Sequence, residues 1–348
     1  MRITISKAKK KKLIRRLIIA LVCILAVVFG LIGYLYFRTK ANPYDLTEPY
    51  SPSADLFDGS DSQTGSDDEA SCAEPFAADL VVSDSDVDLG NIQLQSSDER
   101  GLLFNISTKE AKFSRGCYDR VYPASITKIM TAILCVKYGD LDQSVTMTDA
   151  DVNLGEDSQV SGMAAGDVVT LRQLFSALLV YSANDAAMAI ARTVGGSVSE
   201  FVNMMNEEAA SLGMTGTHFS NPHGLHDENH YTTSYDVYLM LNEASKYTQI
   251  TDVMKNSIYK LVVTDANGTS KTFNLDATDK NLSGAHALPD GVTIMAGKTG
   301  TTDAAGNCLA LAVQNKYGIP YICIIMNAPN KKILYADMDT LLEQTNAE

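Results

Sequence analysis

The sequence predicts a mixed α/β (α+β) domain in which an antiparallel sheet is flanked by helices. Three observations predict this fold class: one strand-like segment comes early, the middle of the chain has helical periodicity, and strand-like segments return late. The early strand is GLLFNI at 101–106. Late strands are expected at 257–264, 271–275, 307–313 and 320–327. A sheet assembled from both ends of the chain accounts for this order.

Helices are predicted where apolar residues recur at spacings of three and four. The first opens at Ser125, directly after Pro123, and Gly139 ends it. Further helices are expected at 171–182, 185–196 and 198–214, with a closing helix at 336–344. The central helices form a helical subdomain beside the sheet.

The N-terminus has the pattern of a membrane anchor. Residues 1–16 carry eight basic side chains and no acid, and residues 17–37 form a stretch of 21 residues without a charge. Only Arg38 and Lys40 follow, so the basic excess predicts a cytoplasmic tail at 1–16 and a single transmembrane helix at 17–37. The alternative, a cleaved secretory signal, would have a shorter apolar stretch and a small-residue cleavage site.

Residues 38–99 are expected to form a disordered, acidic spacer rich in Ser and Asp. Residues 41–99 contain fifteen acids and no base, and their mutual repulsion would keep the segment extended. The net charge of -14 makes nucleic acid an unexpected partner. The remaining residues, 100–348, are predicted to be one extracytoplasmic folded domain.

Neither a metal site nor a disulfide framework is expected. The six cysteines include no Cys-x-x-Cys pair and no zinc spacing. The cluster of His223, His226 and His230 with Asp227 and Glu228 could suggest a metal, but it lacks the helical His-Glu-x-x-His register. No cofactor is predicted.

A Ser-x-x-Lys motif is the first candidate for chemistry. It occurs at Ser6, Ser125 and Ser257, and only Ser125 and Lys128 fall on a predicted amphipathic helix, one turn apart. A lysine can activate a serine hydroxyl if burial and nearby cations lower its pKa enough to leave it neutral. Alone, this pair is most simply read as an ordinary N-cap serine with a surface lysine.

Two further triplets follow in the chain, each occurring once. Ser182-Ala183-Asn184 lies at the junction of two predicted helices, and Lys298-Thr299-Gly300 comes shortly before a predicted strand. Ser-x-x-Lys, Ser-x-Asn and Lys-Thr-Gly in this order resemble the motifs of penicillin-binding proteins and serine β-lactamases. Their flanks, YPASITKIMTA, YSANDAA and AGKTGTTDAAGNCLALA among them, look like the D-alanyl-D-alanine carboxypeptidase family over roughly residues 100–345.

This resemblance implies a β-lactamase/transpeptidase-like fold and a penicillin-inhibited serine carboxypeptidase that acts on bacterial peptidoglycan stems. It implies that Ser125 is acylated while Lys128 accepts its proton, and that Ser182 passes a proton to the leaving amine. Asn184 would hold the substrate backbone, and Lys298 would supply positive charge. Thr299 and Thr301 would bind the substrate carboxylate, and Gly300 belongs to the same substrate-binding segment. The backbone amides of Ser125 and Thr301 would form the oxyanion hole.

The sequence also departs from this family. Many relatives place an arginine after the last strands to bind the substrate carboxylate, but the chain has none beyond Arg192, and Lys331 or Lys332 would have to substitute. A β-lactamase is the first alternative, although no Glu-x-x-Leu-Asn segment follows Ser182. A catalytically silent module that binds wall peptides is the second, and an endopeptidase variant stays open.

Overall fold

The structure, a computed structural model, describes residues 86–90, 92–155 and 158–347. The predicted cytoplasmic tail, the membrane anchor at 17–37 and most of the predicted spacer lie outside these residues. Within the described ranges, no helix has both the length and the apolar character needed to cross a membrane.

A five-stranded antiparallel sheet forms the centre of the domain, in the order β2-β1-β9-β8-β7. This confirms a sheet built from both ends of the chain. Its strands are β1 (Arg100–Asn105), β2 (Glu110–Arg115), β7 (Thr293–Thr302), β8 (Gly306–Gln314) and β9 (Pro320–Ala328).

Both faces of this sheet are covered, which explains why β8 reads as an almost continuous apolar run. Leu309 and Leu311 pack on one face with α9 (Lys331–Gln344), whereas Cys308 and Ala310 pack on the other face with the helical region. Successive side chains alternate between the two cores because a strand has a period of two.

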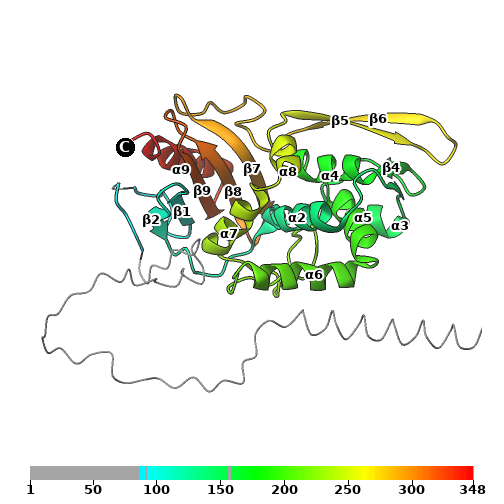
Figure 1. The fold of residues 1–348 in the computed structure, drawn as a ribbon, viewed down its shortest axis with the longest axis horizontal. Coiled ribbons are helices and arrows are strands. Elements are labelled where there is room, and N and C mark those ends of the chain that lie inside the picture. Colours follow the sequence, from blue (N-terminus) through cyan, green and yellow to red (C-terminus); the bar gives the residue numbers. More distant parts are fainter. Residues whose placement is uncertain (1–85, 91, 156–157, 348) are drawn as a thin grey trace, which may run out of the picture. The chain divides into compact units, whose positions relative to one another are not determined.

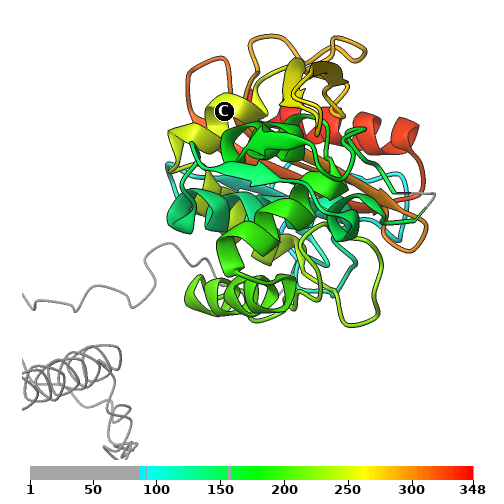
Figure 2. The ribbon, with the colours of Figure 1, turned by 90° about the vertical axis from the view of Figure 1, so that its right-hand side faces the viewer.

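The helical region surrounds α2 (Lys128–Tyr138), which is buried from Lys128 to Cys135. A 3₁₀ turn, η1 (Ala124–Thr127), leads into it, so the predicted helix is present but its first turn is tighter than an α-helix. Seen from the side, the helices stand in front of the sheet (Figure 2). The others are α3 (Asp149–Val152), α4 (Leu171–Val180), α5 (Asn184–Gly195), α6 (Val198–Ser211), α7 (Ser234–Ala244) and α8 (Thr248–Met254).

A second, four-stranded sheet differs from the sequence-based expectation. It has the order β3-β4-β5-β6, so the strands predicted at 257–264 and 271–275 do not join the main sheet. They form a hairpin that extends along the helical region (Figure 1). The side chains of β5 alternate between buried and exposed: Leu261 and Val263 are buried, whereas Val262 is exposed. Only one face of this hairpin therefore packs against the core, as in an antiparallel sheet whose other face is in solvent. The strands are β3 (Ser144–Thr146), β4 (Val168–Thr170), β5 (Ile258–Thr264) and β6 (Ser270–Asp276).

The folded part also begins earlier than residue 100. The Ser114 amide donates to the Val87 carbonyl over 2.6 Å, and the Gln95 side chain donates to Asp337 on α9 over 3.0 Å. Glu99 is fully buried. The described end of the predicted spacer is therefore packed onto the domain, an outcome its polar composition did not indicate.

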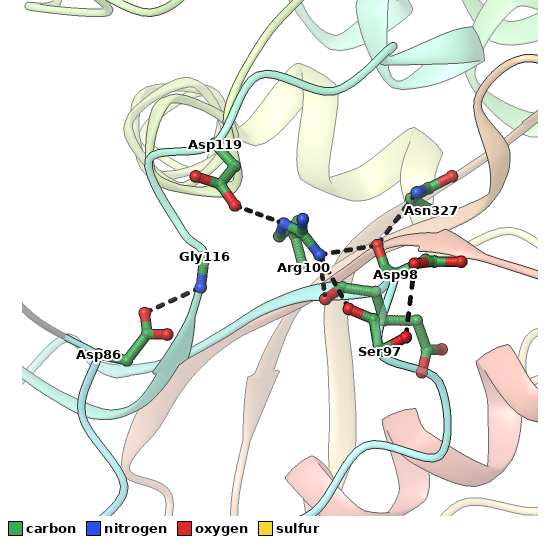
Figure 3. Close-up of polar contacts among 8 residues, drawn as sticks. Asp86, Ser97, Asp98, Arg100, Gly116, Asp119 and Asn327 are labelled. Carbon is green, nitrogen blue, oxygen red and sulfur yellow. Dashed lines mark hydrogen bonds and ion pairs between the residues drawn. The ribbon is translucent and has the colours of Figure 1, made fainter.

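Arg100 and Asn327 hold the end of this segment in place (Figure 3). The Arg100 guanidinium pairs with Asp119 at 2.7 Å and donates to the carbonyls of Ser97 and Asp98. The Asn327 side chain donates to the same Asp98 carbonyl over 3.0 Å, which ties the segment to the end of β9.

Candidate active site

Ser125 and Lys128 meet at the junction of η1 and α2. The Nζ atom of Lys128 lies 2.7 Å from Ser125 Oγ and donates to the His223 carbonyl over 2.6 Å. Lys128 is 0% exposed, and this burial, with the neighbouring charge of Lys298, lowers its pKa well below the ordinary value. Asp185 opposes the shift. A neutral amine beside the hydroxyl can act as its base.

Ser182 and Lys298 form a second pair facing the first. Lys298 Nζ donates to Ser182 Oγ over 2.9 Å and to the Thr299 carbonyl over 3.0 Å. Burial lowers the pKa of Lys298 to about 7, against the opposing charge of Asp279. Ser182 adopts a left-handed backbone conformation with φ of 66° in the turn between α4 and α5. Such a backbone conformation is strained for serine, and strained residues of this kind are concentrated at functional sites, where the surrounding structure fixes the direction of a side chain.

The edge strand β7 approaches the nucleophile closely because its motif contains a glycine. A Cβ atom at Gly300 would come within 3.0 Å of both the Ser125 amide and the Pro123 carbonyl. The missing side chain lets the strand lie against the start of η1. Thr301, the next residue, lines the same cleft as Ser125.

A single cleft joins these parts. Ser125, Ser182, Asn184, Thr299, Gly300 and Thr301 all line it, whereas the two lysines lie buried beneath. The structure thus brings together all eight residues named from the three motifs. Of the two lysines considered as substitutes for the arginine, Lys331, at the start of α9, lines the cleft and Lys332 does not.

Three supporting contacts were not predicted from the sequence. The Asn184 side chain donates to Ser158 over 2.8 Å, and Thr299 Oγ1 donates to Thr278 over 2.6 Å. The His223 carbonyl positions Lys128. Every residue has a backbone carbonyl, so the residue type at position 223 does not indicate this contact. Ser158 and Thr278 stand in polar stretches that resemble ordinary loops.

Gly224 gives the loop beneath the nucleophile its shape. Its φ is 88°, and a Cβ atom there would overlap the Ala124 carbonyl oxygen. Asn221 Oδ1 accepts from the Gly224 amide at 2.7 Å and fixes the turn.

The histidines of this region have structural partners. His230 Nδ1 accepts from the Ser220 amide at 2.9 Å, and its Nε2 lies 2.7 Å from Thr127 Oγ1. Burial lowers the pKa of His230 to about 4, so the ring is neutral and Nε2 is its donor. Within the described residues, no group of three His, Cys, Asp or Glu side chains is placed to hold a metal ion.

Comparisons with known proteins agree with this geometry. The family model described as D-alanyl-D-alanine carboxypeptidase matches residues 103–330. The D-alanyl-D-alanine carboxypeptidase DacF of Bacillus subtilis is 29% identical over 256 residues, 72% of this chain and 62% of that protein. Across three such curated carboxypeptidases, the chain spans only 56–62% of the relative's length.

Solved structures give the same result for the fold. The Streptomyces K15 DD-transpeptidase superposes with a TM-score of 0.67 at 25% identity, covering 75% of this chain and 100% of that one. Penicillin-Binding Protein D2 from Listeria monocytogenes, in a cefotaxime-bound form, has a TM-score of 0.60 at 25% identity, covering 73% and 98%. The transpeptidase-like fold inferred from the motifs is confirmed.

Proposed function

Because this chain belongs to the D-alanyl-D-alanine carboxypeptidase family, we propose that it is a serine peptidase that removes the terminal D-alanine from peptidoglycan stem pentapeptides. One observation carries this proposal: a fully buried lysine with a depressed pKa has its Nζ 2.7 Å from the hydroxyl of Ser125, which lines the cleft.

In the proposed acylation step, Ser125 Oγ attacks the carbonyl carbon of the penultimate D-alanine and Lys128 Nζ takes the hydroxyl proton. The amides of Ser125 and Thr301 would stabilise the oxyanion, where Gly300 lets β7 approach the start of η1 closely. As the C–N bond breaks, Ser182 gives its proton to the leaving amine and Lys298 replaces that proton.

Deacylation would reverse the roles with water as the nucleophile. Lys128 first passes the proton that it took from Ser125 to Lys298 through solvent, which leaves Lys128 neutral and restores the charge of Lys298. Lys128 then takes a proton from water, the hydroxide adds to the acyl carbon, and the bond to Ser125 Oγ breaks. The protonated Lys128 then returns the proton to Ser125, which completes the cycle without a metal or cofactor.

Substrate binding would use the remaining cleft residues. Thr299, Thr301 and Lys331 can bind the C-terminal carboxylate, which places Lys331 in the role of the missing arginine. The Asn184 amide can bind the substrate backbone. β-Lactams would acylate Ser125 in the same way, and residues 17–37 would anchor the enzyme at the outer face of a bacterial cell membrane.

The test is release of free D-alanine from an N-acylated D-Ala-D-Ala peptide by the full-length chain in detergent, with an L-Ala-L-Ala peptide and Ser125→Ala as controls. Release by the wild type alone supports the proposal. Absence of release despite stable penicillin binding would favour a silent binding module, and faster hydrolysis of penicillin than of peptide would favour a β-lactamase.

A further inference from the structure

A second groove neighbours the active-site cleft. It is lined by residues 120–122, parts of 228–231, Ala304 and Asn327. Three of these segments continue from residues that line the cleft: Tyr122 precedes Ser125 by three residues, Glu228 follows Leu225 by three, and Ala304 follows Thr302 by two. Three residues span at most about 10 Å, so the groove lies within reach of a ligand attached to Ser125.

This groove carries one cation and one anion that are free to meet a ligand. The Arg120 guanidinium lies over the Tyr231 ring, with 4.3 Å between its central carbon and the ring centroid. Stacking on one face leaves the N–H groups at the guanidinium edge for a carboxylate. Among the ion pairs of the described residues, neither exposed Arg120 nor exposed Glu228 takes part.

The far wall of the groove is fixed rather than loose. Asn327 has a left-handed φ of 60° and donates to the Asp98 carbonyl over 3.0 Å. Arg100 donates to the same carbonyl over 3.0 Å and holds it in place (Figure 3). The wall is therefore braced by the segment that enters the domain before β1.

The proposed reaction indicates which part of the substrate would lie in the groove. The leaving D-alanine must lie near Ser182, which protonates its amine, at the end of the cleft where Thr299 contacts Thr278. Because the Thr301 hydroxyl binds the carboxylate of that leaving residue in the proposed binding mode, the acyl part extends away from it, past Thr302 in the direction of Ala304. The residue preceding the two D-alanines would project its side chain, whose tip lies about 6–7 Å from the backbone, into the groove.

Resting on that proposed function, we propose that the groove is a subsite for the side chain of the third stem residue and that it selects a zwitterionic diamino dicarboxylic acid such as diaminopimelate. Arg120 binds the side-chain carboxylate and Glu228 binds the side-chain ammonium. A lysine side chain at this position can form an ion pair only with Glu228, and an uncharged side chain can form an ion pair with neither residue.

The test compares three N-acetylated tripeptides ending in D-Ala-D-Ala, with diaminopimelate, lysine or norleucine at the first position, using the full-length protein. Wild-type kcat/KM should fall about tenfold from diaminopimelate to lysine and fall again to norleucine. Arg120→Gln should bring the diaminopimelate-to-lysine ratio close to one, and Glu228→Gln should do so for the lysine-to-norleucine ratio. Lys260→Gln, an exposed change on β5, is the charge-matched control and should preserve both ratios.

Wild-type activity within twofold on all three peptides, a preference for lysine over diaminopimelate, or ratios that persist in Arg120→Gln would overturn the subsite. Labelling by a fluorescent penicillin shows that each variant is folded. Failure of the proposed function itself looks different, because then none of the three peptides is hydrolysed by the wild type.

Discussion

Lys128 and Lys298 share one buried site, at 0% and 1% exposure, and burial together with the charge of Lys298 lowers the pKa of Lys128. The charge that Lys298 keeps near neutral pH makes a second positive charge on Lys128 unfavourable. The two lysines can therefore have different roles. Lys128 can act as a neutral base toward Ser125, and Lys298 can act as a cationic proton donor toward Ser182.

This division predicts a bell-shaped pH dependence of kcat/KM. Activity should rise as pH rises through the lowered pKa of Lys128, and fall as pH rises through about 7, where Lys298 loses its proton. Lys298→Arg should move the alkaline limb beyond pH 9 even if it lowers the maximum, because guanidinium stays charged. An alkaline limb that stays near pH 7 in this variant would exclude Lys298 as its source.

Ser182→Ala should lower kcat about 100-fold, because the leaving amine loses its proton donor. The measurement is steady-state release of D-alanine. Ser211→Ala is the matched control: its hydroxyl donates to the Glu208 carbonyl at the end of α6, outside the cleft, and its loss should leave kcat within twofold of wild type. Equal rates for the two variants would remove Ser182 from the proton path.

Gly224→Ala should destabilise the domain by more than about 2 kcal/mol and slow acylation, because the new methyl group displaces the carbonyl of Ala124 next to the nucleophile. Gly268→Ala is the control, since its φ of 80° is similarly left-handed but no atom lies within 4 Å of its added Cβ. That change should cost about 1 kcal/mol and leave acylation unaltered. Equal losses in both variants would show that backbone strain alone matters.

Glu99 should make stability depend on pH. Burial and the neighbouring Asp337 carboxyl group raise its pKa from 4.5 to about 8, so the folded state holds a proton that the unfolded state releases. This contribution is fully present below pH 4.5 and is lost as pH rises through about 8. Glu99 therefore lowers the Tm between pH 5.5 and 8.5, whereas the lowered pKa values of Lys128, Lys298 and His230 act in the opposite direction.

Glu99→Gln, which mimics the protonated acid, should remove this contribution, so that the Tm of the variant rises relative to that of the wild type between pH 5.5 and 8.5. Circular dichroism is the suitable probe because the chain has no tryptophan. The acid's other neighbours are Arg115, Ser96 and Gln95, which itself bonds to Asp337, and none of them changes in this variant. An unchanged pH dependence of the Tm would contradict the raised pKa.

The motif chemistry could be predicted from the sequence because it depends on local spacing. Ser125 and Lys128 sit one turn apart wherever helical structure forms, and the Ser257–Lys260 alternative fails because β5 starts at Ile258. The contacts beneath the nucleophile could not be predicted in this way. The His223 carbonyl reaches Lys128 across 95 positions of sequence, and nothing in its side chain reports that contact.

Two features of the fold were also beyond local patterns. The sequence of the β5–β6 hairpin predicts strands but not the sheet to which they belong. Its pairing with β4 depends on where α4 leaves an apolar face uncovered. The segment at 86–99 reads as polar spacer, yet a few buried side chains, Ile92 and Leu94 among them, suffice to dock it on the sheet and α9. Three-dimensional context decides both.

The central claim is that Ser125 is the acylated nucleophile. The most direct measurement is the intact mass of the full-length chain after incubation with a fluorescent penicillin, with Ser125→Ala beside the wild type. We predict one covalent adduct on the wild type, located by peptide mapping on Ser125, and none on the variant. An adduct that persists on Ser125→Ala, or none on either protein, would contradict the account.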